Sequence, residues 1–504
     1  MGLAVLTGRA SVGIAAPLVN VEVLLSGGLP RFSIVGLVEA AVRESKDRVR
    51  GAILNSGFDF PQRRITVNLA PADMPKSGGR FDLAIALGIL AASGQVRDDG
   101  LPEYEFYGEL SLGGDLRKVP GILPAALRAA ASGRQLIVPR DNAQEAALGG
   151  AKVLEATSLL GVTAHLNGSA ELPAGRAGLP GPCAGVGPDL ADVRGQQQAR
   201  RALEIAAAGG HNLLYCGPPG TGKTMLARRL PGILPPMTRA EALETAAVSS
   251  VLGLPFDTAQ WRRRPFRAPH HTSSAAALVG GGSQPRPGEI SRAHNGVLFL
   301  DELAEWNRHV LETLREPMES GTITVSRASR QAEFPARFQL VAAMNPCPCG
   351  YLGDPGAACH CSSDRVTNYR ARISAPFIDR IDLHVMVARP GDASIHDPGP
   401  PGETSRCVAR RVENARARQA ARSGCTNAQI ADADFDCAEP DAEGGRLLDD
   451  AIRRFALSLR AQRRILLVAR TIADLADCNR LSSAHVAEAL SLRALDRPAA
   501  AQLR

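Results

Sequence analysis

The feature that most constrains the fold of this chain is the stretch GPPGTGKT, which begins at Gly217 and ends at Thr224. An apolar run, Leu213 to Tyr215, precedes it and a helical pattern follows it, so the stretch is predicted to be a phosphate-binding loop between a strand and a helix. In such a loop backbone N–H groups face phosphate oxygens, Lys223 neutralises the β- and γ-phosphates, and the Thr224 hydroxyl binds Mg²⁺. A chance glycine-rich turn is the alternative, and the flanking elements disfavour it. The other loop residues expected to contact ATP or a close relative are Pro218, Pro219, Gly220, Thr221 and Gly222.

Two further predicted strands end in polar side chains. The run GVLFLDEL ends in Asp301 and Glu302, and FQLVAAMN ends at Asn345. In an α/β fold with a parallel sheet these strand ends meet at one edge, next to the phosphate-binding loop. Asp301 is then expected to orient Mg²⁺, Glu302 to act as the base for the attacking water, and Asn345 to hydrogen-bond that water or the γ-phosphate. The acidic pair could instead cap a helix that begins at Leu303.

The composition is that of a globular protein. Of its 504 residues, 45% are hydrophobic and 22% are charged, and the sequence contains no apolar run long enough to cross a bilayer. The first residues lack the apolar stretch of a secretory signal, so we expect no leader. We therefore expect a cytoplasmic protein that does not bind membranes. The net charge of +7 fits a nucleic-acid partner but does not establish one.

Two segments rich in Gly and Pro, 167–190 and 391–405, are predicted to be linkers. They leave segments of domain size at 1–166, 191–390 and 406–504.

Two long stretches carry a resemblance to a known family. FRAPHHTSSAAALVGGGSQPRPGEISRAHNGVLFLDEL (266–303) and FPARFQLVAAMNPCPCGYLGD (334–354) are similar to the YifB/ComM family of magnesium-chelatase-like AAA+ ATPases, and the likeness extends over almost the whole chain. The resemblance implies a central AAA+ core, a C-terminal helical lid and a homo-hexamer. It also implies that Asn345 is sensor 1, that Arg380 is an arginine finger and that Arg460 is sensor 2.

The two arginine roles also have a physical rationale. A finger supplies positive charge to the γ-phosphate of a neighbouring subunit, so Arg380 requires an oligomer; a surface arginine paired with Asp379 or Asp382 is the alternative. Arg460 precedes a helical apolar stripe that includes Ile465 and Val468. A lid helix that carries Arg460 to the phosphates would couple the state of the nucleotide to the angle of the lid.

The N-terminal segment reads as an α+β unit, because helical spacing in 38–53 is followed by the strand pattern ITVNLAP. The stretches PADMPKSGGRFDLAIALGIL and YGELSLGGDLRKVPGILPAALRAA resemble the proteolytic domain of Lon, a Ser-Lys peptidase with a ribosomal S5 domain 2-like fold. In that alignment Arg80 occupies the nucleophile position and Leu123 the general-base position, while Ser77 and Lys118 are out of register. We expect a peptidase-like fold without peptidase chemistry, which docks a partner or supports a ring.

Four of the cysteines are clustered. Two Cys-x-Cys pairs flank a loop with Gly and Pro, so four thiolates could converge on a structural Zn²⁺, with His360 as a substitute ligand. Free thiols or a redox-labile loop are the alternatives. A closed zinc site would brace the loop that follows Asn345. The four expected ligands are Cys347, Cys349, Cys359 and Cys361.

The segment GTITVSRASRQAEF is predicted to be a β-hairpin just before the strand of Asn345, with Arg327 and Arg330 near its tip. Such hairpins in related AAA+ proteins line a central pore and bind DNA, and two arginines can pair with phosphates regardless of base sequence; a solvated turn is the alternative. His270 and His271, with His294, could form a metal site, but hydrogen bonding within a loop is favoured.

Three functions remain open. The resemblance implies an ATP-dependent hexameric DNA motor, a helicase that promotes branch migration in natural transformation and homologous recombination. Single-stranded or branched DNA in a central pore and recombination proteins would be its partners. The second function is an ATPase chaperone for metal insertion, and the third is an ATP-dependent protease, which the absence of the Ser-Lys pair disfavours.

Overall fold

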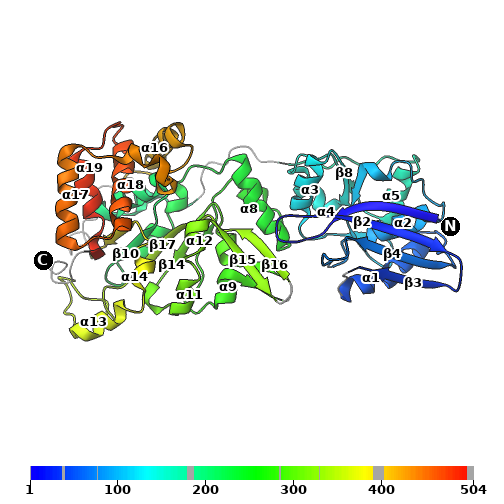
Figure 1. The fold of residues 1–504 in the computed structure, drawn as a ribbon, viewed down its shortest axis with the longest axis horizontal. Coiled ribbons are helices and arrows are strands. Elements are labelled where there is room, and N and C mark those ends of the chain that lie inside the picture. Colours follow the sequence, from blue (N-terminus) through cyan, green and yellow to red (C-terminus); the bar gives the residue numbers. More distant parts are fainter. Residues whose placement is uncertain are drawn as a thin grey trace.

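The computed structural model of this chain describes residues 2–36, 40–76, 78–178, 187–282, 285–327, 330–389 and 402–496. The molecule is elongated, with an N-terminal α/β unit at one end, a second sheet in the middle and a group of helices over that sheet at the other end (Figure 1). Of the two predicted linkers, residues 179–186 and 391–401 lie outside the described residues.

The N-terminal unit is built on a mixed sheet. Its strands are β1 (Gly2–Arg9), β2 (Leu18–Ser26), β3 (Arg31–Val35), β4 (Arg64–Ala70), β5 (Tyr104–Phe106), β8 (Gln135–Pro139) and β9 (Val153–Ala156). Among the described residues they lie in the order β3-β4-β2-β1-β5-β8-β9, with β1 antiparallel to β2 and β2 antiparallel to β4. A small ribbon joins β6 (Glu109–Leu110) to β7 (Leu116–Arg117).

The alternation of apolar and polar side chains along the strands decides which face of this sheet is buried. Along β2 the side chains of Val19, Val21, Val23 and Leu25 are buried, and their neighbours are more exposed. They pack against α2, whose buried face includes Leu83 and Leu87. The helices of the unit are α1 (Ala40–Asn55), α2 (Asp82–Ala92), α3 (Ile122–Ala131), α4 (Arg140–Ala147) and α5 (Leu159–Leu166). The mixture of strands and helices agrees with the α+β prediction.

The central sheet is parallel. Its strands are β10 (Leu213–Cys216), β11 (Phe266–Arg267), β14 (Val297–Leu300), β17 (Gln339–Met344) and β18 (Leu383–Met386). In the described part of the chain their order is β11-β14-β17-β10-β18, and every neighbouring pair is parallel. The expected α/β core with a parallel sheet is therefore confirmed.

Both faces of the central sheet are covered, which explains why its strands read as continuous apolar runs. Leu213 and Tyr215 face α6 (Gln197–Gly209) and the C-terminal helices. Leu214 and Cys216 face the opposite layer. That layer contains α9 (Ala275–Val279), α10 (Glu289–Arg292), α11 (Arg308–Glu312), α14 (Ala375–Ile378) and the hairpin of β15 (Thr322–Arg327) and β16 (Arg330–Pro335).

Helix α7 (Lys223–Ala227) packs Leu226 and Ala227 against this sheet, and the other described helices and strands of the central segment surround it. They are α8 (Arg239–Val251), the ribbon of β12 (Gly280–Gly281) and β13 (Arg286–Pro287), α12 (Pro317–Ser320) and α13 (Ser363–Arg370).

The C-terminal segment is helical, as predicted. It contains α16 (Ser405–Ser423), α17 (Ala442–Phe455), α18 (Leu459–Leu475) and α19 (Ser483–Ser491). Helix α18 buries Ile465, Val468 and Ile472 on the stripe that the sequence predicts, against the central sheet layer. Among the described residues no helix combines the length and the apolar character needed to cross a membrane.

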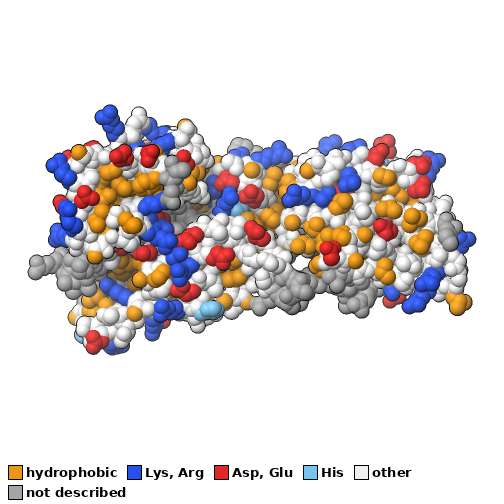
Figure 2. Space-filling view, viewed as in Figure 1, with side chains coloured by type: hydrophobic (Ala, Val, Ile, Leu, Met, Phe, Trp, Pro, Cys, Tyr) orange, Lys and Arg blue, Asp and Glu red, His pale blue; other side chains and the backbone are white. Residues whose placement is uncertain are grey.

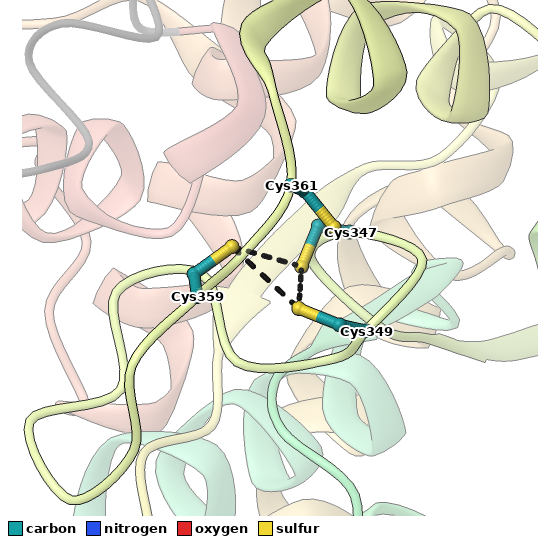
Figure 3. A group of neighbouring side chains, drawn as sticks. All are labelled: Cys347, Cys349, Cys359 and Cys361. Atoms are coloured by element: carbon teal, nitrogen blue, oxygen red, sulfur yellow. Dashed lines mark hydrogen bonds between the residues drawn. The ribbon is translucent and has the colours of Figure 1, made fainter.

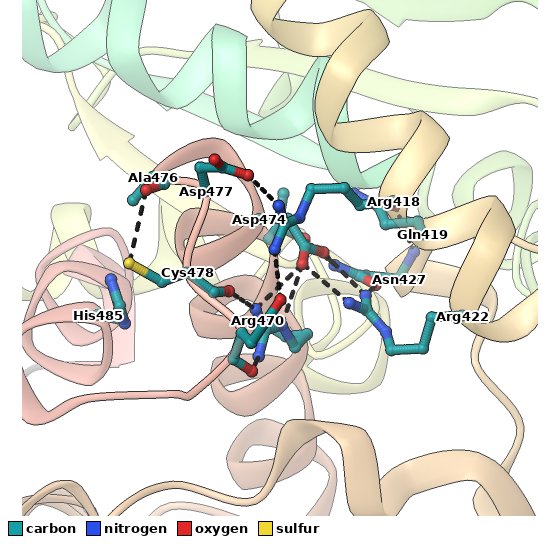
Figure 4. Close-up of polar contacts among 12 residues, drawn as sticks. Arg418, Gln419, Arg422, Asn427, Arg470, Asp474, Ala476, Asp477, Cys478 and His485 are labelled. Carbon is teal, nitrogen blue, oxygen red and sulfur yellow. Dashed lines mark hydrogen bonds and ion pairs between the residues drawn. The ribbon is translucent and has the colours of Figure 1, made fainter.

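A buried ionic network holds α16 to α18. The Asp474 carboxylate accepts hydrogen bonds from Arg422 at 2.8 and 2.9 Å, from Arg470 at 3.1 and 3.2 Å, and from Asn427 at 2.9 Å. Figure 4 shows these three side chains pointing toward Asp474. The pairing matters because Arg470 is only 2% exposed and a buried guanidinium needs a counter-charge.

The N-terminal unit rests on helix α8. Ser250, near the end of α8, accepts a hydrogen bond at its carbonyl from Gly121 N–H at 2.8 Å and at its Oγ from Leu123 N–H at 3.2 Å. It thereby caps the first turn of α3 from another part of the chain. Gly13 also lies against β16, where a Cβ would come within 2.9 Å of the Glu333 carbonyl oxygen.

Candidate nucleotide-binding site

The phosphate-binding loop lies between β10 and α7, as the sequence predicts. Gly217 has no room for a side chain, because a Cβ would come within 2.2 Å of the Val387 carbonyl oxygen. Gly222, with φ of +87°, adopts the left-handed conformation from which α7 begins. Lys223 is the first residue of α7 and donates from Nζ to the carbonyl oxygens of Gly217 at 2.6 Å and Pro218 at 2.8 Å.

The three polar strand ends meet at this loop. Lys223 Nζ also donates to Asn345 Oδ1 at 3.2 Å, and the Thr224 hydroxyl donates to Asp301 Oδ2 at 2.7 Å. Burial lowers the pKa of the Lys223 ammonium from its ordinary value, since charge is less well solvated there. A hydroxyl beside a carboxylate is a fitting pair of oxygen ligands for Mg²⁺, and the lysine provides the positive charge that phosphates require.

Glu302 lies next to this group on a strained backbone. Its φ of 51° and ψ of 48° are left-handed, which for a residue other than glycine costs about 1–3 kcal/mol and is typical of functional sites. Its side chain is half exposed, and its Oε2 lies 3.0 Å from His271 Nδ1.

The histidines do not form a metal site in the described part of the chain. His270 and His271 stack with ring centroids 4.2 Å apart, and His270 Nδ1 lies 2.9 Å from the Thr272 hydroxyl. His294 is buried and pairs with Glu244 at 3.0 Å. The favoured interpretation, hydrogen bonding within a loop, agrees with the His270 contact, whereas His294 pairs with Glu244 of helix α8.

Arg380 and Arg460 lie together, but at the other edge of the sheet. Both contact Glu319, Arg380 at 2.9 Å and Arg460 at 3.1 Å. Arg380 lies just before β18. The first residue of β18 is paired with the first residue of β10, so Arg380 lies near the beginning of β10. The phosphate-binding loop, by contrast, follows the end of β10. The length of that four-residue strand, about 13 Å, therefore separates the two edges. Within the described part of the chain Arg380 pairs with Glu319 in place of Asp379 or Asp382, and Asp382 pairs with Arg464.

A cavity of about 780 Å³ lies at this edge of the sheet, beside Glu319 and Arg460. It is lined by residues that precede β10, β14, β17 and β18, and by the first turns of α18. Figure 2 shows Lys and Arg side chains gathered along this boundary. The arginines that line the cavity are Arg264, Arg337, Arg416, Arg460, Arg463 and Arg464.

The four clustered cysteines come together after β17 (Figure 3). The sulfur atoms of Cys347 and Cys349 are 3.3 Å apart, and that of Cys359 lies 3.7 and 3.6 Å from them. Cys361 completes the group, and the four sulfur atoms all lie within 4.8 Å of one another. Tetrahedral zinc with Zn–S bonds near 2.3 Å separates its sulfurs by about 3.8 Å, so the donor set fits zinc. His360 is not part of this group.

The cysteine cluster contacts the nucleotide site. Hydrogen bonds, that of the Tyr351 backbone first, lower the pKa of the Cys349 thiol to about 6, whereas the pKa of the Cys359 and Cys361 thiols is raised, as expected for thiols that share one negative charge. Gly350 is packed against Pro219 of the phosphate-binding loop, where a Cβ would come within 2.7 Å of the proline ring. Gly350, which follows Cys349, therefore lies between Pro219 of the phosphate-binding loop and the Asn345 side chain.

The remaining candidate residues lie in two places. Arg327 and Arg330 are paired in register at the end of the β15–β16 hairpin, and their side chains lie outside what the structure describes. In the N-terminal unit Arg80 is buried against the ring of Tyr107, and Leu123 is buried within α3. Ser77 lies outside the described residues.

Two residues of the site were missed by the sequence reasoning. Glu319 joins Arg380 to Arg460. The sequence gives only a weak indication of this role, because Glu319 is simply an acidic residue just before a predicted hairpin. The contact of His271 with Glu302 could have been found from the Pro-His-His stretch only by recognising the two-residue strand β11, which is too short to show a period.

The chain is similar to known proteins over nearly its whole length. Family profiles match at residues 189–395 (magnesium chelatase, subunit ChlI), 21–142 (subunit ChlI of Mg-chelatase) and 402–493 (magnesium chelatase, subunit ChlI C-terminal). The chain is 50% identical over 504 residues to competence protein ComM of Haemophilus influenzae, covering 99% of this chain and 98% of that protein. It is 48% identical over 503 residues to the uncharacterized protein YifB of Escherichia coli, with the same coverage. Similarity to the magnesium-chelatase 38 kDa subunit of Cereibacter sphaeroides is 29% over 176 residues, 31% of this chain and 51% of that subunit.

Proposed function

The chain belongs to the YifB/ComM family of magnesium-chelatase-like proteins, and we propose that it is an ATP-dependent DNA motor that assembles as a homo-hexamer. The observation that carries the ATPase part is the convergence of Lys223, Thr224, Asp301 and Asn345 at one sheet edge. Those side chains supply a phosphate cation, two oxygen ligands for Mg²⁺ and a polar group for the attacking water. Thr224 and Asp301 would hold Mg²⁺, which when bound would supply positive charge against the charge that develops during hydrolysis.

Hydrolysis at an interface between protomers is supported by the position of the two arginines. Arg380 and Arg460 lie about a strand length from the phosphate-binding loop of their own chain and share Glu319. A protomer that presents this edge to the loop of its neighbour brings both guanidinium groups to the neighbour's γ-phosphate. Glu319 then holds the two cations side by side until the phosphate replaces it.

DNA is proposed as the substrate that the motor moves. The hairpin of β15 and β16 directly precedes β17, the strand that ends next to Asn345, so a shift of that strand on hydrolysis would move the hairpin. Arg327 and Arg330 at its tip would pair with backbone phosphates regardless of sequence. The Haemophilus relative is named a competence protein, which supports a role in natural transformation. Branch migration is the activity that we propose for the motor.

Two further elements belong to this proposal. A zinc ion at the four-cysteine cluster would brace the loop after Asn345 in the reducing cytoplasm, where thiols persist. The N-terminal unit, with a buried arginine and a buried leucine at the positions of the Lon-like dyad, would support the ring through its contact with Ser250 and not cleave peptides.

The test is strand displacement by the purified full-length chain on forked and four-way DNA, with Glu302→Gln as the inactive control. We expect unwinding that requires ATP and Mg²⁺ and that the control lacks. ATP hydrolysis with no unwinding of either substrate at any salt concentration would refute the DNA motor and leave the ATPase in place.

A further inference from the structure

The peptide that joins Asp301 to Glu302 is held at both of its polar atoms. Asp301 lies just past the end of β14, so its carbonyl oxygen is outside the hydrogen-bonded ladder of the sheet. That oxygen accepts a hydrogen bond from the indole Nε1–H of Trp306 at 2.9 Å. The Glu302 N–H, on the other side of the same peptide, donates to Asp301 Oδ1 at 3.0 Å. The plane of this peptide is therefore fixed.

The fixed peptide sets the backbone of Glu302. Rotation of the peptide changes φ of Glu302, which at 51° is left-handed and strained for a residue other than glycine. The Glu302 carbonyl is held as well, because it accepts a hydrogen bond from Glu305 N–H at 2.7 Å. Since 54% of the Glu302 side chain is exposed, its direction depends on this backbone more than on packing.

The same peptide joins the candidate base to the candidate Mg²⁺ ligands. Asp301 Oδ2 accepts a hydrogen bond from the Thr224 hydroxyl at 2.7 Å, while Oδ1 accepts from Glu302 N–H. A turn of the peptide would therefore disturb the Asp301 carboxylate and the direction of the Glu302 side chain together.

Trp306 is a rigidly placed donor. Only 3% of it is exposed, and it belongs to the buried apolar layer that includes Leu300 and Leu311. An indole has a single N–H donor, and a buried one needs an acceptor. A short 3₁₀ turn, Leu303–Glu305, separates Trp306 from the two acids and returns its indole to the Asp301 carbonyl. The donor is thus anchored in the core, while its acceptor lies at the nucleotide site.

We propose that Trp306 is a positioning residue for ATP hydrolysis, whose indole N–H holds the Asp301–Glu302 peptide so that Glu302 stays directed at the attacking water. The inference rests on the proposed ATPase function. Because it is buried in the apolar layer, Trp306 acts through the backbone and not on the phosphates. Without its N–H the Asp301 carbonyl loses a donor, and Glu302 can relax from the left-handed backbone and move its carboxylate away from the water.

The experiment removes the N–H in two ways. Trp306→Phe keeps an aromatic ring without a donor, and replacement of Trp306 by benzothienylalanine, in which sulfur takes the place of the N–H, also keeps the size of the indole. We expect kcat for ATP hydrolysis to fall about 3- to 30-fold in both, with ATP affinity within about twofold of wild type. The affinity is kept because the phosphate-binding loop is unchanged. A fluorescent ATP analogue measures it.

The matched control is Trp261→Phe, which makes the same change at the other tryptophan of the chain. Its indole N–H donates to none of the residues that the structure describes, so this variant should keep the kcat of wild type. Thermal unfolding verifies that each variant is folded. If Trp306→Phe does not fold, the benzothienylalanine variant, which keeps the shape of the side chain, decides the question.

The hydrogen bond itself gives a second readout. In the Trp261→Phe variant Trp306 is the remaining tryptophan, and the resonance Raman band of its indole N–H should have the frequency of a hydrogen-bonded indole. A benzothienylalanine variant with the kcat of wild type, or a Raman band typical of a free N–H, would overturn this inference alone. A wild-type chain without ATP turnover would overturn it together with the proposed function.

Discussion

The buried carboxylate of Asp474 gives the most quantitative prediction for the fold. Replacing it by asparagine, Asp474→Asn, keeps the volume but removes the negative charge that balances Arg422 and Arg470. Arg470 is 2% exposed, and its guanidinium would face an amide that also carries donors. Breaking a buried ion pair of this kind costs about 3–5 kcal/mol. The opening free energy of α16 and α18 should fall by that amount.

Hydrogen exchange on the full-length chain measures this quantity locally. At about 1.4 kcal/mol per factor of ten, amides of α18 should exchange roughly a hundredfold to a few thousandfold faster in Asp474→Asn. The matched control is Asp477→Asn, in which the exposed partner of Arg418 is changed and asparagine still tolerates the left-handed backbone. That control should change the opening free energy by less than about 1 kcal/mol. Equal protection in Asp474→Asn and wild type, or equal losses in both variants, would refute the reasoning.

Three further predictions concern the site. Glu302→Gln should bind ATP as wild type does and lose about 10²- to 10⁴-fold in kcat, as measured by phosphate release; full turnover would remove Glu302 as the base. Elemental analysis of protein purified without chelator should find about one zinc per chain. The zinc should be lost in Cys349→Ser and kept in Cys407→Ser, which changes an exposed cysteine outside the cluster. Absence of zinc in the wild-type protein would show that the four cysteines are ordinary thiols. Arg327→Ala and Arg330→Ala should each lower the slope of log affinity for DNA against log salt by about one, and unchanged slopes would exclude the hairpin tip as a phosphate contact.

The nucleotide site was largely predictable because it depends on local rules. A glycine-rich loop between a strand and a helix, and two apolar runs that end in Asp301 and Asn345, fix a parallel sheet whose strand ends meet. The four-cysteine cluster was predictable in the same way, since its members lie within 15 residues of sequence and a loop can return one pair to the other.

The second half of the site depends on contacts distant in sequence, which no local pattern encodes. Arg460 meets Glu319 only because the C-terminal helices pack over the amino-terminal edge of the sheet, so the sequence suggested a lid arginine but not the edge at which it lies. The pairing of His271 with Glu302 depends on the two-residue strand β11. Ser250 caps α3 across 127 residues, a contact that propensity cannot indicate.

Cleavage of ATP across a protomer interface is tested most directly by mixing two inactive variants. Arg380→Ala keeps an intact nucleotide site without the arginine, and Glu302→Gln keeps the arginine beside a site that binds but does not hydrolyse ATP. In randomly mixed rings about a quarter of the interfaces join an intact site to an intact arginine. ATP turnover should therefore be near zero for each variant alone and should rise toward about a quarter of wild type on mixing. A mixture as inactive as its components, or Arg380→Ala with normal turnover alone, would contradict the account.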